Sequence, residues 1–272
     1  MRSSIMAAVF LCGAAACNGT AAASAILCTV VTDAASGKVL KQEGHCTERV
    51  TAASTFKIAL SLMGYDAGYL TDEHLPSLPF REGYPDWDPS WKAATDPAYW
   101  IKNSVVWYSQ RLTEWLGESR FQHYVTAFHY GNEDLSGDPG QHNGLTHAWL
   151  SSSLKISAVE EVGFLRKIVE RRLPVSARAY DMTSRITAIS EPQTGWDVHG
   201  KTGTGSARKA DGSEDDAHAY GWFVGWATKA GRTLVFARLI QDGPADAKQE
   251  LRTGLRARAE FLQELPTLLG GL

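Results

Sequence analysis

The pattern of apolar and polar positions predicts strands at both ends of the chain. Residues 26–32 and 39–42 are rich in β-branched and alternating apolar residues, and the turn sequence Ala35-Ser36-Gly37-Lys38 separates them. This arrangement is typical of a β-hairpin. Three apolar runs near the C-terminus predict adjacent antiparallel strands, the last two joined by a tight turn; the runs cover residues 196–201, 219–228 and 232–240.

Helical periodicity occupies the middle of the chain. Residues 54–68 are apolar on almost every face, as expected of a buried helix, and Gly68 suits its C-terminal cap. Further patterns predict helices at 105–116, 119–128, 159–171 and 245–265. Proline-rich residues 76–103 predict an irregular segment, and Gly-, Asn- and Asp-rich residues 131–144 predict a loop.

Strands at both ends with helices between them favour one mixed α/β (α+β) catalytic domain over residues 26–272. We expect a five-stranded antiparallel sheet flanked by helices, built from residues 26–53 and 190–272. An inserted all-helical region should cover about 69–189.

The first residues have the order of a secretory signal. A basic residue is followed by an apolar run over residues 5–16 and then by small residues up to Ala25. We expect residues 1–25 to be removed, with cleavage after Ala23 as a close alternative. The apolar run is too short for a permanent membrane span. The mature protein is therefore expected to be secreted, in the periplasm.

Removal of this segment leaves two cysteines, Cys28 and Cys46. An even pair in an exported protein predicts a disulfide, and both residues flank the predicted hairpin. A lipid anchor on Cys17 is disfavoured, because Ala14 stands where lipoprotein signals usually carry Leu.

The bulk composition excludes several classes of partner. The formal net charge is −3 and 44% of residues are hydrophobic, which is ordinary for a globular protein and gives no sign of nucleic-acid or membrane-surface binding. The eight histidines show neither H-x-H nor H-E-x-x-H spacing, so no metal site is expected.

The first candidate chemistry is Ser54-Thr55-Phe56-Lys57, at the start of the buried helix. Residues i and i+3 share one helix face, so the Lys57 amine can reach the Ser54 hydroxyl. A serine needs such a base, and apolar burial favours the neutral amine that can serve as one. The pattern S-x-x-K also occurs at Ser152 and Ser206, but only the first occurrence lies in an apolar helix.

Three further motifs are ordinary when taken alone. Lys201-Thr202-Gly203 ends a predicted strand, where Lys and Thr can hold a carboxylate and Gly permits close approach. The Thr204 amide could pair with that of Ser54 as an oxyanion hole. Ser104-Val105-Val106 fits a helix N-cap, and Tyr130-Gly131-Asn132 fits a turn.

Together, in this order, the motifs are the skeleton of the penicillin-recognising serine enzymes. The chain resembles the class D, oxacillin-hydrolysing, β-lactamases over essentially its whole mature length. The residues that carry this resemblance are Ser54-Thr55-Phe56-Lys57, Ser104-Val105-Val106, Tyr130-Gly131-Asn132, Trp149-Leu150 and Lys201-Thr202-Gly203. The class A alternative carries Ser-Asp-Asn where this chain has Ser104-Val105-Val106, and its deacylation scheme is not supported.

The resemblance implies the penicillin-recognising fold and a carboxylated lysine. Ser54 would be the nucleophile, and Lys57, after reaction with carbon dioxide or bicarbonate, the general base. Trp149 would support the carbamate through its indole N–H. Val106 and Leu150 would form an apolar wall around it. No other cofactor is expected.

The remaining roles concern the substrate. Ser104, helped by Lys201, would pass a proton to the lactam nitrogen, and Thr202 would bind the substrate carboxylate. A guanidinium should assist through a bidentate contact. Arg252, at the start of the last helix, matches the family's position best, and Arg238 on a predicted strand is its rival. The turn Tyr130-Gly131-Asn132 is expected to shape the floor of the site.

The predicted function is hydrolysis of the β-lactam ring of penicillins and related antibiotics through a serine acyl-enzyme, conferring resistance. Two alternatives stay open: a β-lactam sensor or penicillin-binding domain that acylates once, and a small D,D-peptidase. The substrate spectrum is undetermined, and the oligomeric state is left between monomer and homodimer.

Overall fold

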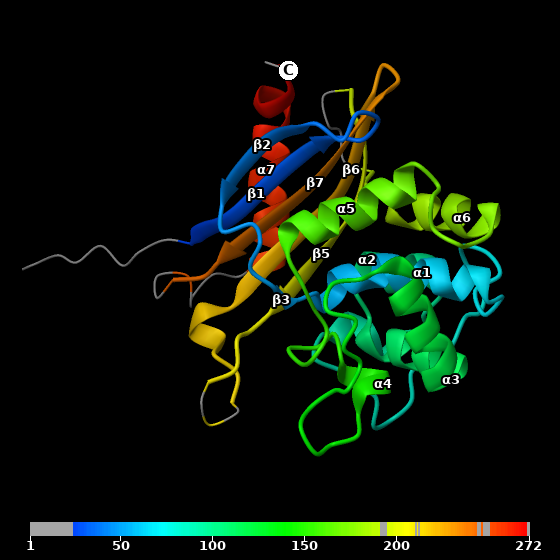
Figure 1. The fold of residues 1–272 in the computed structure, drawn as a ribbon. Helices are drawn as coiled ribbons and strands as arrows, with labels where there is room; N and C mark the ends of the chain where they lie inside the picture. The colour runs from blue at the N-terminus through cyan, green and yellow to red at the C-terminus, as the bar shows by residue number, and fades with distance from the viewer. Residues whose placement is uncertain are drawn as a thin grey trace, which may run out of the picture.

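A five-stranded antiparallel sheet with the order β2-β1-β7-β6-β5 forms the centre of the molecule, which confirms the predicted sheet (Figure 1). The computed structural model describes residues 24–190, 195–209, 211, 213–243, 246 and 251–270. The predicted signal peptide therefore lies almost wholly outside the described residues. The strands are β1 (Ala25–Asp33), β2 (Val39–Gly44), β5 (Asp197–Gly205), β6 (Tyr220–Lys229) and β7 (Arg232–Gln241).

Helices lie between the N-terminal and C-terminal strands, and one more closes the chain. A short two-stranded sheet, β3 (Val50–Thr51) with β4 (Lys155–Ile156), connects the two parts. The helices are α1 (Lys57–Asp66), α2 (Pro97–Asn103), α3 (Val106–Phe128), α4 (Gly144–His147), α5 (Ala158–Val169), α6 (Ala177–Thr187) and α7 (Thr253–Gly270). Short 3-10 turns cover Ala53–Phe56, Pro89–Lys92 and Asp216–His218.

The helices differ from the predicted boundaries in four places. The α-helix expected from residue 54 begins at Lys57, because Ala53–Phe56 form a 3-10 turn. The two predicted helices at 105–128 form one element, α3, interrupted at Gly117 by a non-helical backbone. Helices α2, α4 and α6 were not predicted, and α7 begins at Thr253. Most of residues 244–250, where the last helix was expected to begin, are outside the described residues.

Helices cover both faces of the large sheet (Figure 1). On one face α7 packs its Phe261 ring against Phe223 and Phe236, with ring centroids 5.8 and 4.3 Å apart. On the other face α5 packs against β1 and β7. Helices α1, α2 and α3 form a compact group beside the β5 edge, and their core contains several fully buried tryptophans.

The predicted disulfide is confirmed, because Cys28 of β1 and Cys46 after β2 are bonded with an S–S distance of 2.06 Å. In the part of the chain that the structure describes, no helix is long and apolar enough to cross a membrane.

Candidate active site

The turn Ala53–Phe56 presents Ser54 between β3 and α1. Ala53 has the left-handed backbone angle φ 49°, and Ser54 is partly exposed while both of its neighbours are buried. The buried Nζ of Lys57 lies 2.9 Å from Ser54 Oγ. Every residue from Lys57 to Tyr65 is buried, so the predicted burial of this helix is confirmed.

Burial sets the charge state of the two lysines of the site. It lowers the pKa of Lys57 well below its usual value, and the positive charge of nearby Lys201 lowers this pKa further. Burial also lowers the pKa of Lys201 to about 7, with an added contribution from Arg258. A neutral Lys57 amine can accept a proton from Ser54, which an ammonium cannot do.

Ser54 opens into a cavity of about 710 Å³ between the helical part and the sheet. Ser104 reaches its wall from the C-terminal cap of α2, in the left-handed conformation with φ 59°. Val106 begins α3 beside it. Eight of the predicted site residues line this one cavity: Ser54, Ser104, Val106, Leu150, Thr202, Gly203, Thr204 and Arg252.

Strand β5 packs directly on the turn Ala53–Phe56 that contains Ser54. A Cβ added to Gly203 would lie 3.1 Å from the Ala52 carbonyl oxygen and 3.2 Å from the Ser54 backbone nitrogen. Only glycine allows this approach without displacement of the turn. Thr204 Oγ1 accepts a hydrogen bond from the Gly254 amide at 3.0 Å, so the same strand is tied to the start of α7.

Lys201 lies behind the wall of the main cavity. Its side chain is buried, and its Nζ donates to the Thr202 carbonyl oxygen at 3.1 Å. It borders a second, smaller cavity of about 330 Å³, whose lining also includes Thr202.

The structure separates the two candidate arginines. Arg252 is about half exposed at the edge of the main cavity, where it donates to the Trp87 carbonyl oxygen at 3.3 Å. Arg238 is fully buried and pairs with Glu264 of α7 at 3.2 Å. The expectation that Arg238 is a candidate for substrate binding is therefore wrong, because its position on β7 directs it to the α7 face of the sheet.

Trp149 is fully buried beside the residue that precedes Lys57. Its ring lies 5.7 Å from the Phe56 ring and 6.3 Å from the Phe121 ring. Its indole Nε1 has no hydrogen-bond partner among the described residues. A buried donor without a partner is costly, so this N–H is suited to an added acceptor. A carboxyl group on Lys57 would be such an acceptor.

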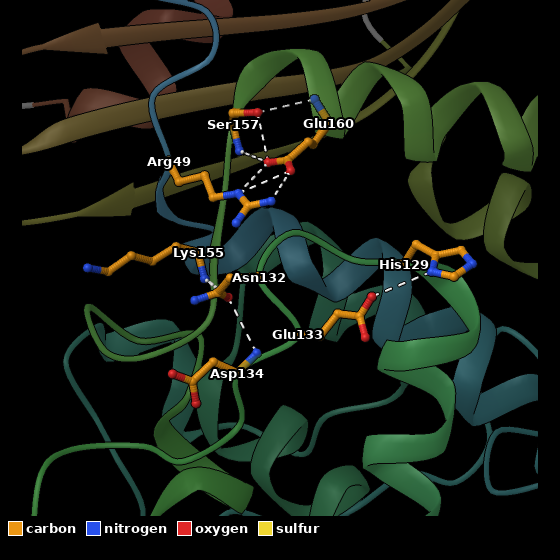
Figure 2. A network of polar contacts seen from close by, with 8 residues as sticks. All are labelled: Arg49, His129, Asn132, Glu133, Asp134, Lys155, Ser157 and Glu160. Atoms are coloured by element: carbon orange, nitrogen blue, oxygen red, sulfur yellow. Dashed lines mark hydrogen bonds and ion pairs between the residues drawn. The ribbon is translucent and has the colours of Figure 1, made fainter.

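The turn Tyr130-Gly131-Asn132 does not line the cavity, which corrects the expectation that it forms the floor of the site. Asn132 instead accepts from the Lys155 amide at 2.8 Å (Figure 2). It also donates to the Ser153 carbonyl oxygen at 2.8 Å. The turn therefore holds the segment that follows Leu150, and it acts on the cavity wall through that segment.

Part of the cavity wall was not predicted from the sequence. Trp87, Asp88 and Trp91 line it from the proline-rich segment, and Leu255 lines it from α7. One sequence signal for this segment was Asp88 before Pro89, because an Asp followed by Pro is typical of a helix start. Asp88 does cap the 3-10 turn Pro89–Lys92. The described residues contain no cluster of three or more His, Cys, Asp or Glu side chains that could hold a metal.

Comparisons with known proteins agree with this geometry. Residues 27–266 match the penicillin binding protein transpeptidase domain. The chain is 45% identical to "Beta-lactamase OXA-9" of Klebsiella pneumoniae (89% of this chain, 88% of the relative) and 33% identical to "Beta-lactamase OXA-1" of Escherichia coli (89% and 84%). The crystal structure of OXA-427 class D β-lactamase is similar with a TM-score of 0.83 and 50% identity, covering 90% of this chain and 98% of that one. The chain therefore belongs to the penicillin-binding transpeptidase family and, within it, to the class D β-lactamases.

Proposed function

We propose that the protein hydrolyses the β-lactam ring of penicillins and related antibiotics through an acyl-enzyme on Ser54, and thereby confers resistance. The observation that carries the proposal is the 2.9 Å contact between Lys57 Nζ and Ser54 Oγ, made where the turn Ala53–Phe56 leads into the buried helix α1, with the serine at the cavity surface. Ser54 Oγ would attack the lactam carbonyl carbon, the C–N bond would break, and water would later release the acyl group.

The base beside Ser54 is Lys57. Burial lowers its pKa well below the usual value and so favours the uncharged amine. We further propose that this amine reacts with carbon dioxide, forming an N–C bond and losing a proton, to give a carbamate. The carbamate, when present, supplies an anionic general base for acylation and for hydrolysis.

Two features of the chain suit such a group. The partnerless Trp149 N–H provides a buried donor for its negative charge. Val106 and Leu150 provide an apolar surface at the cavity wall, which would limit access of water.

Protonation of the lactam nitrogen falls to Ser104 and Lys201. Ser104 lines the cavity together with Ser54, and Lys201 lies behind Thr202 with a pKa of about 7. A lysine with that pKa can hold a proton near neutral pH and pass it on through a hydroxyl.

Thr202 and Arg252 are the groups proposed to bind the substrate carboxylate. Both line the cavity, and an arginine can bind a carboxylate through two parallel hydrogen bonds. The amides of Ser54 and Thr204 are proposed as the oxyanion hole. The close packing of Gly203 on the Ser54 turn supports this pairing, because it brings the two backbone segments together.

Turnover of a chromogenic cephalosporin tests the function. We expect repeated hydrolysis by the wild-type protein and none by Ser54→Ala. A single stoichiometric acylation without turnover would indicate a sensor instead. Release of terminal D-alanine from a peptide without lactam hydrolysis would indicate a D,D-peptidase. The disulfide and the predicted signal support export, and we propose a periplasmic location.

A further inference from the structure

Glu161 is a buried acid that the chemistry proposed above does not use. It lies in the first turn of α5 and is 1% exposed. Its Oε1 lies 2.9 Å from the Thr55 hydroxyl and 2.9 Å from the Tyr130 hydroxyl. Thr55 directly follows Ser54, and Tyr130 begins the Tyr-Gly-Asn turn. One carboxyl group therefore connects two motifs that lie far apart in the sequence.

The hydroxyl of Thr55 has a second partner that limits its role. Thr55 Oγ1 lies 2.7 Å from the Ala52 carbonyl oxygen. A hydroxyl has one proton, and a carbonyl oxygen can only accept. If Thr55 donates to Ala52, its contact with Glu161 needs a proton from the carboxyl group. An ionised Glu161 would instead compete with Ala52 for the single Thr55 proton.

When Glu161 is protonated, all of these hydrogen bonds can form at the same time, because each group donates to the next one in the series. Tyr130 donates to Glu161 Oε1, the protonated Oε1 donates to Thr55, and Thr55 donates to Ala52. All four residues are buried, so an unmade hydrogen bond could not be replaced easily by water. Since the Ala52 oxygen lies against Gly203, the chain of contacts ends at the strand that forms the opposite wall of the site.

The charges around Glu161 support the protonated form. The pKa of Glu161 is raised to about 7: burial raises it most and the adjacent Glu160 adds to this, while the hydrogen bonds of Thr55 and Tyr130 oppose the shift. Glu160 points outward and is held by Arg49 (Figure 2). The N-terminal position of Glu161 in α5 favours a negative charge, but this effect is smaller than the effect of burial.

We propose that Glu161 is a positioning residue: in its protonated form it fixes the turn that presents Ser54, and its ionisation slows acylation. The inference rests on the proposed role of Ser54 as nucleophile. When Glu161 ionises, it draws the Thr55 proton away from Ala52. The turn that contains Ser54 then loses the hydrogen bond from Thr55 to Ala52, which spans the serine.

The test measures the acylation rate of Ser54 by a slowly released fluorescent penicillin as a function of pH, with bicarbonate in excess. Wild type and the two variants Glu161→Gln and Glu160→Gln are compared. A glutamine donates hydrogen bonds but does not ionise. We expect the acylation rate of the wild type to fall as pH rises through about 7. The Glu161→Gln variant should lack this part of the fall. At alkaline pH its acylation rate should therefore exceed that of the wild type about three- to tenfold, which is the effect of one hydrogen bond.

Glu160→Gln is the matched control, because it removes the neighbouring carboxylate whose pKa is lowered to about 2 by Arg49 and Ser157. It should keep the fall in rate and move it slightly to lower pH, because the Glu160 carboxylate contributes to the raised pKa of Glu161. Ionisation of Lys57 and Lys201 is common to all three proteins, so the difference between them isolates Glu161. A Glu161→Gln protein with the full wild-type fall in rate would overturn the proposal.

A second measurement does not depend on activity. Infrared difference spectra between about pH 5 and about pH 9 should show a buried carboxylic-acid band in wild type and Glu160→Gln, and no such band in Glu161→Gln. Absence of the band from wild type would also overturn the proposal. If Glu161→Gln does not fold, Tyr130→Phe is the second test. Loss of the Tyr130 hydrogen bond should raise the pKa of Glu161 and move the fall in rate to higher pH. A fall at the wild-type pH in Tyr130→Phe would overturn the proposal.

Failure of the proposed function has a different signature. A wild-type protein that is never acylated at Ser54, at any pH, would refute the role of Ser54. The infrared band would then still report whether Glu161 is protonated.

Discussion

The guanidinium of Arg252 lies 3.4 Å from the carboxylate of Asp88 at the edge of the cavity that contains Ser54. The contact joins the proline-rich segment to the start of α7. Arg252 is about half exposed, so this ion pair is screened by solvent and contributes little to stability. A substrate carboxylate can therefore take the place of Asp88 at low energetic cost.

Replacement of Arg252 by Ala should lower kcat/KM for penicillins about ten- to hundredfold, mainly through a higher KM, because a charge-assisted contact is lost. Steady-state kinetics check this. Arg238→Ala is the matched control: it should leave kcat/KM of the folded protein near wild type but lower the Tm, since it leaves Glu264 without its partner. The reverse pattern would show that Arg238, and not Arg252, binds the substrate carboxylate.

Replacement of Lys57 by Ala should lower turnover by about a thousandfold or more, because Ser54 loses the base that is 2.9 Å away. Steady-state assays and mass spectrometry of any trapped acyl-enzyme measure the two steps separately. Circular dichroism establishes that the variant is folded. Deacylation at a near-normal rate in this variant would contradict the assignment of Lys57 as the base.

Activity should fall in buffer depleted of bicarbonate, most strongly at low pH, and recover when bicarbonate is added. Burial lowers the pKa of Lys57, and below that pKa the amine becomes protonated and cannot hold carbon dioxide. Trp149→Phe removes the partnerless N–H and should raise the bicarbonate concentration needed for half-maximal activity. An enzyme insensitive to bicarbonate under all these conditions would argue against the carbamate.

Glu161 should also make stability depend on pH. Its pKa is raised from 4.5 to about 7 on folding, so the folded protein binds more protons than the unfolded chain between these values. Its contribution is fully present below about pH 4.5 and is lost as pH rises through 7. The difference is on the order of 3 kcal/mol. Urea unfolding of wild type and Glu161→Gln across this range checks it, and identical pH profiles would contradict it.

The sheet could be predicted from the sequence because its strands are runs of β-branched and aromatic residues bounded by turns. Helix α6 was missed because its residues are mostly polar. Two signals were present: Ser176, which accepts a capping hydrogen bond from the Ala179 amide at 3.3 Å, and the helical spacing of buried Ala179, Met182 and Ile186. Helix α2 was hidden by the many prolines around it, although Asp96 before Pro97 is a helix-start signal.

The motif residues around Ser54 could be predicted because their order and spacing are distinctive, but their surroundings could not. The contact of Glu161 with Tyr130 joins positions 31 residues apart, and with Thr55 positions 106 apart. No local pattern encodes such pairs. In the same way, the choice between Arg252 and Arg238 required knowing which face of the sheet the Arg238 side chain occupies. That face depends on the register of β7 with its neighbouring strands.

Strand β5 is the edge strand of the sheet, and its outer edge faces away from β6. Within the described ranges, the outer side of β5 forms a single bridge, between Ala188 and His199. Beyond His199, the backbone from Lys201 to Gly205 has a strand partner only on the β6 side. An unpaired strand edge can accept an extended, amide-containing molecule as though it were one more strand. Ligands with a peptide-like side chain would then be aligned by main-chain hydrogen bonds, whatever their substituents.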